Sequence, residues 1–255
     1  MDASLKRVVG ESPQVTRIAT GFKSAAGPVH SRIGYLLFSN SDKILKWQDG
    51  KLTVFRDKSN GARALTFDHQ GRLLACEEDR VTRTEKNGSA TILAKLRNPI
   101  DVMYAIDQNI YYCDDQAVYR VKRGGGTVTA SRECQQPSGL ALAPNQQKLF
   151  VSDTARKNIR VFDIAADGAL TGGRVFVDVK QSPLGGLKTD ESGKVWVAGP
   201  GGIWVFDHEG QHLGTIPVPE EPSNLNWGNG FRDVFVTTGT SVYRIEAHTN
   251  GTRTY

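Results

Sequence analysis

Short runs of apolar and aromatic residues alternate with polar turns along the chain, and the alternation repeats. The clearest run occurs six times, as KILKW at 43–47, RVTRT at 80–84, AVYRV at 117–121, NIRVF at 158–162, GIWVF at 202–206 and SVYRI at 241–245. Another run, rich in β-branched and aromatic residues, precedes each copy, at 35–40, 72–77, 109–114, 148–153, 194–199 and 233–238. Runs of this length between turns such as HQG, DQN and ESG predict β-strands.

A third strand begins each unit, and its spacing shows that the units form one array. It starts at Ala26, Arg63, Ile100, Ser138, Gly185 and Asn224, with successive starts 37, 37, 38, 47 and 39 residues apart. Most units end with a more polar fourth strand, at 52–55, 90–93, 127–130, 174–177 and 213–216. Strand units that repeat every ~40 residues are typical of β-propellers. We therefore predict an all-β fold, a six-bladed β-propeller with four-stranded antiparallel blades.

The sixth unit lacks a fourth strand of its own, whereas the segment QVTRIA at 14–19 reads as a strand without a unit. We predict that this N-terminal strand completes the sixth blade and closes the ring, which removes an exposed sheet edge. Because the repeat is unbroken, residues 1–255 are expected to form a single domain.

Composition narrows the possible settings and partners. The net charge is +5, but the 32 Lys and Arg residues are scattered, so a solvated basic surface is favoured over a nucleic-acid site. No run is apolar enough to span a membrane, and the N-terminus lacks a secretory pattern, so a cytoplasmic protein without membrane contact is expected. Three cysteines are too few for a disulfide framework and are interpreted as core residues: Cys76, Cys113 and Cys134.

The repeat also predicts where a ligand binds. Innermost propeller strands start around one mouth of the central channel, and the antiparallel middle strands return to that mouth about 14 residues later. The inner ring is formed by the six strand starts given above. The outer ring is formed by Asn40, Glu77, Asp114, Asp153, Gly199 and Thr238. Side chains that converge on a concave mouth predict a site for a small-molecule ligand.

Six segments carry a resemblance to a known family: AGPVH at 26–30, NGARALTFDHQGRLLACE at 60–77, NPIDV at 98–102, PSGLALAPNQQKLFVSDT at 137–154, LGGLKTDESGKVWV at 184–197 and EEPSNLNWG at 220–228. They resemble the gluconolactonase, senescence-marker-protein and luciferin-regenerating-enzyme family of six-bladed propellers. The resemblance implies a divalent cation, calcium or zinc, at the channel mouth, and hydrolysis of sugar lactones or related esters there. Such a cation would polarise the carbonyl and activate water while a carboxylate handles the proton.

The residues that the resemblance implies as metal ligands are replaced. Ala26 stands for a Glu, Ser138 for an Asn and Gly185 for an Asp. Around them, His30 stands for a Trp and Ile100 for an Asn, and Arg63 replaces a pocket Asn or Asp. Calcium needs six to eight oxygen ligands, which Ala and Gly side chains do not supply. The sequence therefore predicts that no metal is bound, and that restoring Glu, Asn and Asp at the three positions returns metal affinity.

Several polar residues remain at the predicted mouth. Asp101 is the candidate catalytic residue, because the resemblance matches it to a proton-handling Asp. Asp114 and Asp153 are interpreted first as caps of turn amides. Arg63 is expected to recruit an anion or to be neutralised by Asp101. The predicted pocket comprises Ala26, His30, Arg63, Ile100, Ser138, Asp153, Gly185 and Asn224.

Three functions stay open from the residues. The first, which we favour, is a metal-independent small-molecule-binding protein, or divergent enzyme, that uses the channel mouth. The second is an active metal-dependent lactonase, a hydrolase whose calcium or zinc is held by a shifted ligand set: Asp101, Asp153 and Asn224. The third is a propeller that binds protein or RNA through its basic face.

Overall fold

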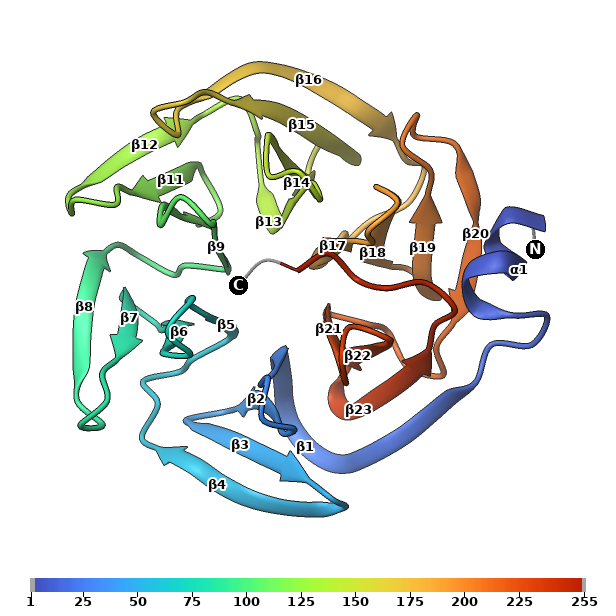
Figure 1. The fold of residues 1–255 in the computed structure, drawn as a ribbon, viewed down its shortest axis with the longest axis horizontal. Coiled ribbons are helices and arrows are strands. Elements are labelled where there is room, and N and C mark those ends of the chain that lie inside the picture. Colours follow the sequence, from blue (N-terminus) through green and yellow to red (C-terminus); the bar gives the residue numbers. More distant parts are fainter. Residues whose placement is uncertain (1–2, 254–255) are drawn as a thin grey trace.

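The computed structural model describes residues 3–253, which contain one helix and 23 strands (Figure 1). Helix α1 (Ala3–Val9) lies outside the ring of strands. All strand pairs are antiparallel, and the sheets are arranged around a central axis. The all-β, antiparallel class is therefore confirmed. No helix among the described residues is long and apolar enough to cross a membrane.

Four sheets contain four strands each and correspond to the second to fifth repeat units. The second unit is β5 (Ala64–Phe67), β6 (Leu73–Cys76), β7 (Arg80–Thr84) and β8 (Ala90–Lys95). The third is β9 (Asp101–Tyr104), β10 (Ile110–Cys113), β11 (Val118–Val121) and β12 (Thr127–Ser131). The fourth is β13 (Pro137–Leu142), β14 (Lys148–Asp153), β15 (Asn158–Ile164) and β16 (Leu170–Asp178). The fifth is β17 (Leu187–Thr189), β18 (Val195–Gly199), β19 (Gly202–Phe206) and β20 (His212–Pro217).

The remaining seven strands form one sheet in the order β21-β22-β23-β1-β2-β3-β4. It combines the last unit with the first, through β1 (Val15–His30), β2 (Leu36–Asn40), β3 (Lys43–Gln48), β4 (Lys51–Asp57), β21 (Asn224–Gly228), β22 (Asp233–Thr237) and β23 (Gly239–Glu246).

Strand β1 closes the ring. Its N-terminal half pairs with β23, where Val15 is opposite Ile245, and its C-terminal half pairs with β2, where His30 is opposite Leu36. The predicted pairing of the N-terminal segment with the last unit is confirmed by this register. The sequence did not predict that the same strand continues into the first unit. The register shifts between Thr20 and Ala25, next to Gly21 with φ +90°, and the strand therefore passes from one unit to the other without ending.

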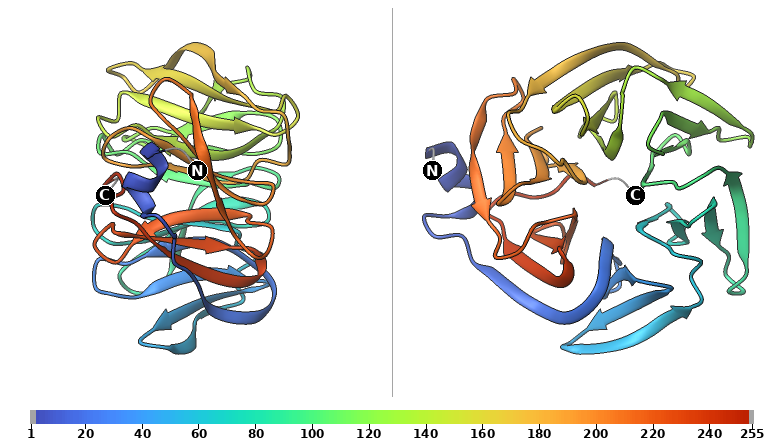
Figure 2. Two further views of the ribbon diagram at one scale, coloured as in Figure 1. Left: turned by 90° about the vertical axis from the view of Figure 1, so that its right-hand side faces the viewer. Right: turned by 180° about the vertical axis from the view of Figure 1, so that it is seen from behind.

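The innermost strands are the C-terminal half of β1 together with β5, β9, β13, β17 and β21, and each packs beside the next around the axis (Figure 1). All six start on one face of the ring, and their hairpins to the middle strands lie on the other. We call these the start face and the hairpin face. In the edge-on view the C-terminal segment lies at one face of the ring (Figure 2).

The core consists of six apolar clusters, and each joins two successive units. Between the last two units, for example, the rings of Trp196 and Trp227 meet edge to face at 5.0 Å. Helix α1 adds Leu5, Val8 and Val9 to this same cluster. The three cysteines are buried and free, and burial raises the pKa of each thiol, as expected for core residues.

Candidate functional site

The predicted inner ring lies on the start face, and backbone contacts place its members next to one another. A Cβ added to Gly27 would lie 2.5 Å from the carbonyl oxygen of Arg63, and one added to Gly139 would lie 2.6 Å from that of Gly185. One added to Gly186 would lie 1.9 Å from Oδ1 of Asn224. The inner strands therefore approach so closely at this face that a side chain at Gly27 or Gly139 would collide with backbone atoms, and one at Gly186 with the Asn224 side chain.

Asp101 follows Ile100 of the inner ring and is buried, with 3% of its surface exposed. Its Oδ1 accepts a hydrogen bond from the N–H of Val102 (2.9 Å) and its Oδ2 from that of Leu140 (2.8 Å). Burial raises the pKa of Asp101, whereas the Lys188 ammonium, the two N–H groups and the amide of Asn224 act in the opposite direction. The carboxylate thus faces inward, toward strands of three other units.

Lys188 is a polar residue of the channel that the sequence reasoning missed. It is 8% exposed, and its Nζ donates to the carbonyls of Leu187 (2.8 Å) and Leu140 (3.3 Å). Burial lowers the pKa of this lysine, and the charge of Asp101 opposes that effect. The repeat itself carried a signal, since the same position of the other inner strands holds Val29, Thr66, Met103, Ala141 and Trp227. A lysine at a position that is uncharged in the five other inner strands indicates a charge inside the channel.

Arg63 is half-buried, and its guanidinium donates from Nη1 to Oδ1 of Asn98 at 2.6 Å. Asn98 has φ +56° and begins the approach to β9. Its neighbour Ile100 is half-buried and packs against the cluster between the third and fourth units. The side chain of Arg63 therefore spans the boundary between the second and third units rather than lying against Asp101 with an ion pair.

Ser138 is tied to the next unit. Its hydroxyl lies 3.0 Å from Oγ1 of Thr154, which donates to the carbonyl of Leu184 (2.8 Å) and accepts from the N–H of Leu184 (3.1 Å). Ser152 adds a bond to the carbonyl of Gly185 at 2.8 Å. These hydroxyl groups hold the segment before β17 against the fourth unit.

Gly185 is walled in by the backbone of the last unit. A Cβ at this position would lie 2.2 Å from the carbonyl oxygen of Ser223 and 3.1 Å from Cβ of Ala198. An Asp restored here would therefore collide with main-chain atoms unless the backbone shifts. Ala26 contributes only its carbonyl to the network, accepting from Oγ of Ser39 at 3.1 Å.

Two carboxylates of the outer ring, those of Asp153 and Asp114, accept from main-chain N–H groups, whereas Glu77 accepts from arginine and threonine side chains. Asp153 is 0% exposed, and its two oxygens accept from the N–H groups of Gln135 (2.7 Å) and Gln136 (3.0 Å). Asp114 accepts at Oδ1 from the N–H groups of Gln116 and Ala117, both at 2.9 Å. The contacts of Asp114 are those that turn capping predicts, whereas Asp153 caps the following turn only through the longer bond from the N–H of Arg156 (3.3 Å) and mainly binds the segment before β13.

His30 does not share the face of Ala26. It ends β1 on the hairpin face, where its ring stacks on Phe235 with 5.4 Å between centroids and lines a small cavity beside Trp227. Burial lowers the pKa of His30. Because side chains along an extended strand advance by about 3.3 Å per residue, His30 lies one strand length from the predicted mouth.

The residues of the start face do not fit a divalent cation. Among residues 3–253, no group of three or more His, Cys, Asp or Glu side chains is placed to hold a metal ion. The positions that the resemblance assigns to ligands offer one hydroxyl, which is already bonded to Thr154. The shifted ligand set is separated too, since Asp153 bonds to the amides before β13 while Asp101 lies inside the channel.

A cleft of about 520 Å³ opens on the start face between the second and third units. It is lined by Glu78, Arg97, Asn98, Asp114, Asp115 and Gln116. Asn98 also accepts the bond from Arg63, so one lining residue of the cleft contacts the inner ring. Carboxylate, carboxamide and guanidinium groups together offer both donors and acceptors, which suits a ligand rich in hydroxyl groups.

The hairpin face of the channel is closed by the C-terminal segment. The hydroxyl of Thr252 lies 2.7 Å from that of Thr189 and donates to the carbonyl of Asp190 at 3.0 Å. Gly251 fits beneath Trp227, where an added Cβ would lie 2.0 Å from the indole ring. The C-terminal segment therefore covers the channel at the hairpin face.

A family model and a characterised relative match the chain. A family model described as the SMP-30/Gluconolactonase/LRE-like region matches residues 102–240. A gluconolactonase from Zymomonas mobilis is 24% identical over 302 aligned positions, which cover 97% of this chain and 85% of the relative.

Solved structures agree in fold. A gluconolactonase from Xanthomonas campestris superimposes with a TM-score of 0.89 at 26% identity, covering 97% of this chain and 93% of the other. Regucalcin from Agrobacterium tumefaciens, a calcium-binding protein, superimposes with a TM-score of 0.83 at 17% identity, covering 94% and 96%. The latter likeness concerns the fold alone.

Proposed function

The chain belongs to the SMP-30/gluconolactonase/LRE-like family, and from this premise we propose that it binds a small polyhydroxylated molecule, of the sugar-lactone or sugar-acid class, without a metal. The site is the start face of a single six-bladed propeller domain, in which the seven-stranded sheet counts as two blades. The relatives named gluconolactonase suggest the ligand class, and the polar cleft from Glu78 to Gln116 supports it.

The contact between Gly185 and Ser223 carries the proposal. A position that loses a ligand by substitution alone keeps room for the side chain, whereas this one is filled by a main-chain carbonyl 2.2 Å from the missing Cβ. Calcium sites need several charged or carbonyl oxygens around one point. The contact therefore supports a site in which the ligand is bound by protein groups directly and not through a metal ion.

Binding is supported more directly than hydrolysis. A general base must be within hydrogen-bond reach of the proton it takes. Asp101 is 3% exposed, and both of its oxygens already accept from main-chain N–H groups. A divergent hydrolase that uses Asp101 would have to displace these bonds before the carboxylate met water or substrate.

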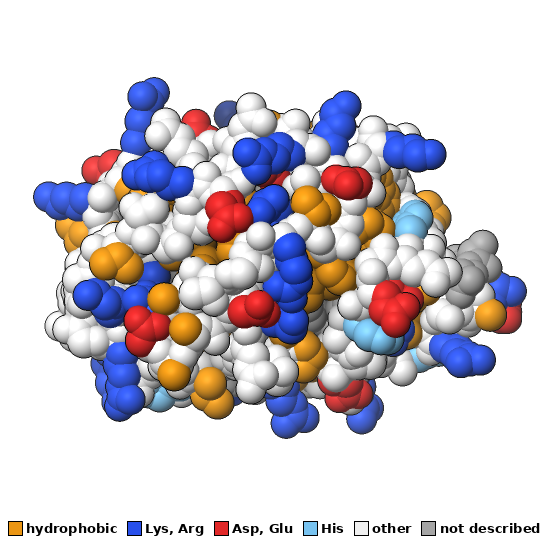
Figure 3. All heavy atoms as spheres, turned by 90° about the horizontal axis from the view of Figure 1, so that it is seen from above, with side chains coloured by type: hydrophobic (Ala, Val, Ile, Leu, Met, Phe, Trp, Pro, Cys, Tyr) orange, Lys and Arg blue, Asp and Glu red, His pale blue; other side chains and the backbone are white. Residues whose placement is uncertain are grey.

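Neither alternative function gains a specific observation. For a lactonase with a shifted ligand set, Asn224 does approach Asp101, but Asp153 is bonded to turn amides. For a protein- or RNA-binding propeller, the basic residues would have to gather on one surface. Figure 3 shows Lys and Arg interspersed with Asp and Glu over the side that it presents.

Two titrations test the proposal. D-gluconate and D-glucono-1,5-lactone, followed by ligand-observed NMR, should bind the untreated and the chelator-treated protein equally. Asp115→Asn and Asn98→Gly should each weaken binding several-fold, since the first removes a charged acceptor and the second removes the amide while keeping the backbone at φ +56°. Asp178→Asn, at an exposed strand end of another unit, is the matched control.

Calcium and zinc are titrated in parallel and followed by thermal unfolding. A ligand that binds only the folded state must raise the melting temperature, and we expect no rise. A rise of several degrees together with chelator-sensitive hydrolysis of the lactone would replace the proposal with the metal-dependent lactonase. Absence of sugar-acid binding at tens of millimolar would contradict the ligand class.

A further inference from the structure

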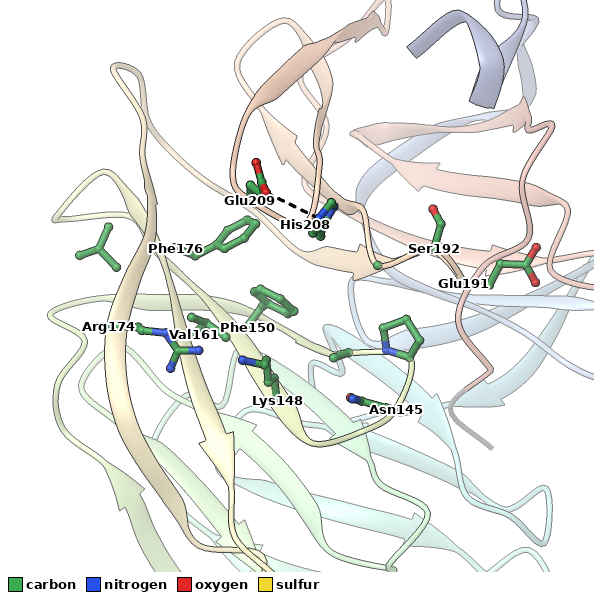
Figure 4. A pocket seen from close by; sticks show the side chains of 14 residues that line it. Asn145, Lys148, Phe150, Val161, Arg174, Phe176, Glu191, Ser192, His208 and Glu209 are labelled. Atoms are coloured by element: carbon green, nitrogen blue, oxygen red, sulfur yellow. Dashed lines mark ion pairs between the residues drawn. The ribbon is translucent and has the colours of Figure 1, made fainter. Parts of the chain in front are cut away.

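A second and larger cleft lies on the hairpin face, between the fourth and fifth units, away from the site proposed above. Its volume is about 580 Å³, within the range of small-molecule sites. It is lined by side chains of the β13–β14 turn, β14, β15, β16 and the turns that follow β17 and β19 (Figure 4). Neither the resemblance nor the start-face site assigns a role to this cleft.

The fourth unit is built to form one wall of this cleft. The spacing from Ser138 to Gly185 is 47 residues, whereas the other units repeat every 37 to 39. The extra length lies in the long third and fourth strands, β15 with 7 residues and β16 with 9. Val161 on β15 and Phe176 on β16 line the cleft, so the longest unit forms one of its walls.

The floor of the cleft is aromatic and apolar. Phe150 and Phe176 meet edge to face, with ring centroids 5.0 Å apart and an interplanar angle of 73°. Val161 lies beside them, and Val175 at the rim is 44% exposed. A ligand ring can pack on such a pair in an offset or edge-to-face geometry. This geometry stabilises binding beyond the contribution of the buried apolar surface. The floor therefore favours a ligand with a flat ring.

One wall carries an excess of positive charge. Lys148 and Arg174 point into the cleft from β14 and β16 (Figure 4). Both pair with the same carboxylate, Asp163, at 3.4 Å from Lys148 and 3.1 Å from Arg174. Two cations with one shared anion leave one positive charge without compensation. A guanidinium and an ammonium so placed accept a carboxylate from a ligand.

The opposite wall is acidic. Glu209 extends over the cleft beside His208, with 3.9 Å between the imidazole and the carboxylate, and Glu191 lies further along the same side with its carboxylate turned away and bonded to Asn250 (Figure 4). A second carboxylate on the ligand would meet these like charges and be disfavoured. The two walls therefore select a single negative charge at one end of the ligand and orient it toward Arg174.

We propose that this cleft is a second small-molecule site, which binds an aromatic monocarboxylate with its ring on Phe150 and Phe176 and its carboxylate between Lys148 and Arg174. The site is separate from the channel and shares no lining residue with the start-face cleft. Ligand binding in this cleft does not depend on whether the start face binds a sugar acid.

The test uses 3-phenylpropionate and the full chain, with binding followed through the methyl signals of Val161 and Val175. We expect a dissociation constant on the order of 1 mM for a ligand of this size. The neutral alcohol 3-phenylpropanol, the ring-free propionate and the dicarboxylate phenylsuccinate should each bind about tenfold more weakly. Equal affinity for propionate would overturn the role of the aromatic floor.

Charge variants separate this site from general attraction to a basic protein. Arg174→Gln leaves Lys148 paired with Asp163 and should weaken binding about tenfold, whereas Asp163→Asn frees a second cation and should tighten it several-fold. Arg123→Gln, an exposed arginine of the third unit, is the matched control and should change nothing. Equal weakening by Arg123→Gln and Arg174→Gln, or no effect of Asp163→Asn, would refute the proposal.

Discussion

Asp101 and Lys188 are connected through one residue, Leu140, whose backbone N–H donates to the carboxylate and whose carbonyl accepts from the ammonium. The connection runs across three consecutive units of the ring. It places two opposite charges in a channel where each is more than nine-tenths buried. The pair therefore links the units electrostatically as well as by apolar packing.

Removing one charge of this pair should destabilise the protein. Asp101→Asn leaves the Lys188 ammonium with two carbonyl partners, and we expect a loss of about 3 kcal/mol in the free energy of unfolding. Asp101→Asn combined with Lys188→Met should lose less than the sum of the single changes, because both charges are then absent. Urea unfolding measures each value. The exposed pair Asp115→Asn and Lys122→Met should be additive and nearly neutral; additivity at 101 and 188 would contradict the coupling.

Gly185 should tolerate no side chain. Gly185→Ala places a Cβ against the carbonyl of Ser223, and overpacking of this kind costs about 2 kcal/mol or more. Gly124→Ala is the control, because it has open space and an ordinary φ. Calorimetry of Ala26→Glu, Ser138→Asn and Gly185→Asp combined should show no tight calcium or zinc binding. A triple variant that melts like the unmodified chain and binds calcium would show that the family site needs only its ligands back.

Glu220 should give the protein an acid-sensitive stability. Its carboxylate accepts bonds from Thr240, Ser241, Thr238 and Tyr243, and these lower its pKa to about 2. A lowered pKa stabilises the fold above the unfolded value near 4.5, and this stability is lost as the pH falls toward 2.

Glu220→Gln should therefore lose about 1–2 kcal/mol at pH 7, a figure reduced for the partial exposure of the group. The difference from the unmodified protein should shrink between pH 5 and pH 2. Glu221→Gln, one residue further and exposed, should show no such pH dependence. A constant difference at every pH would mean that hydrogen-bond geometry rather than charge is responsible.

Ring closure can be tested by truncation. Deleting residues 1–20 removes the half of β1 that pairs with β23 and exposes the edge of that strand, so aggregation is expected. Deleting residues 1–11 removes α1 but keeps β1, so the protein should stay monomeric while melting at a lower temperature. Light scattering after size exclusion distinguishes the two. A monomeric, stable 1–20 deletion would contradict the role of β1 in closure.

The repeat predicted the strands and the start face because its period depends on local alternation of apolar and polar residues. The same reasoning placed His30 by motif, although four further residues of extended chain carry it to the opposite face. It predicted the cap formed by Asp114 because an acceptor two or three residues from turn amides is a local feature, whereas the main partners of Asp153 lie 17 and 18 residues earlier in the chain. Lys188 and the wall at Gly185 were not found, since both depend on how neighbouring units approach each other.

The cleft on the hairpin face shows the same limit. The 47-residue spacing was visible in the sequence, but spacing alone does not say which side of a unit the extra residues extend. The wall of the cleft becomes apparent only from the packing of β15 and β16 against the fifth unit.

The pairing of β1 with β23 determines how late in synthesis the ring can close. The hydroxyls of Thr20 and Ser241 lie 2.9 Å apart in the closed ring but are 221 residues apart along the chain. During synthesis, the N-terminal half of β1 must wait, with its edge unpaired, until almost the whole polypeptide has left the ribosome. Contacts of such long range slow folding, and until they form the unpaired strand edge is prone to aggregation. Chaperones that bind nascent chains are thus expected to act mainly on the N-terminal half of β1.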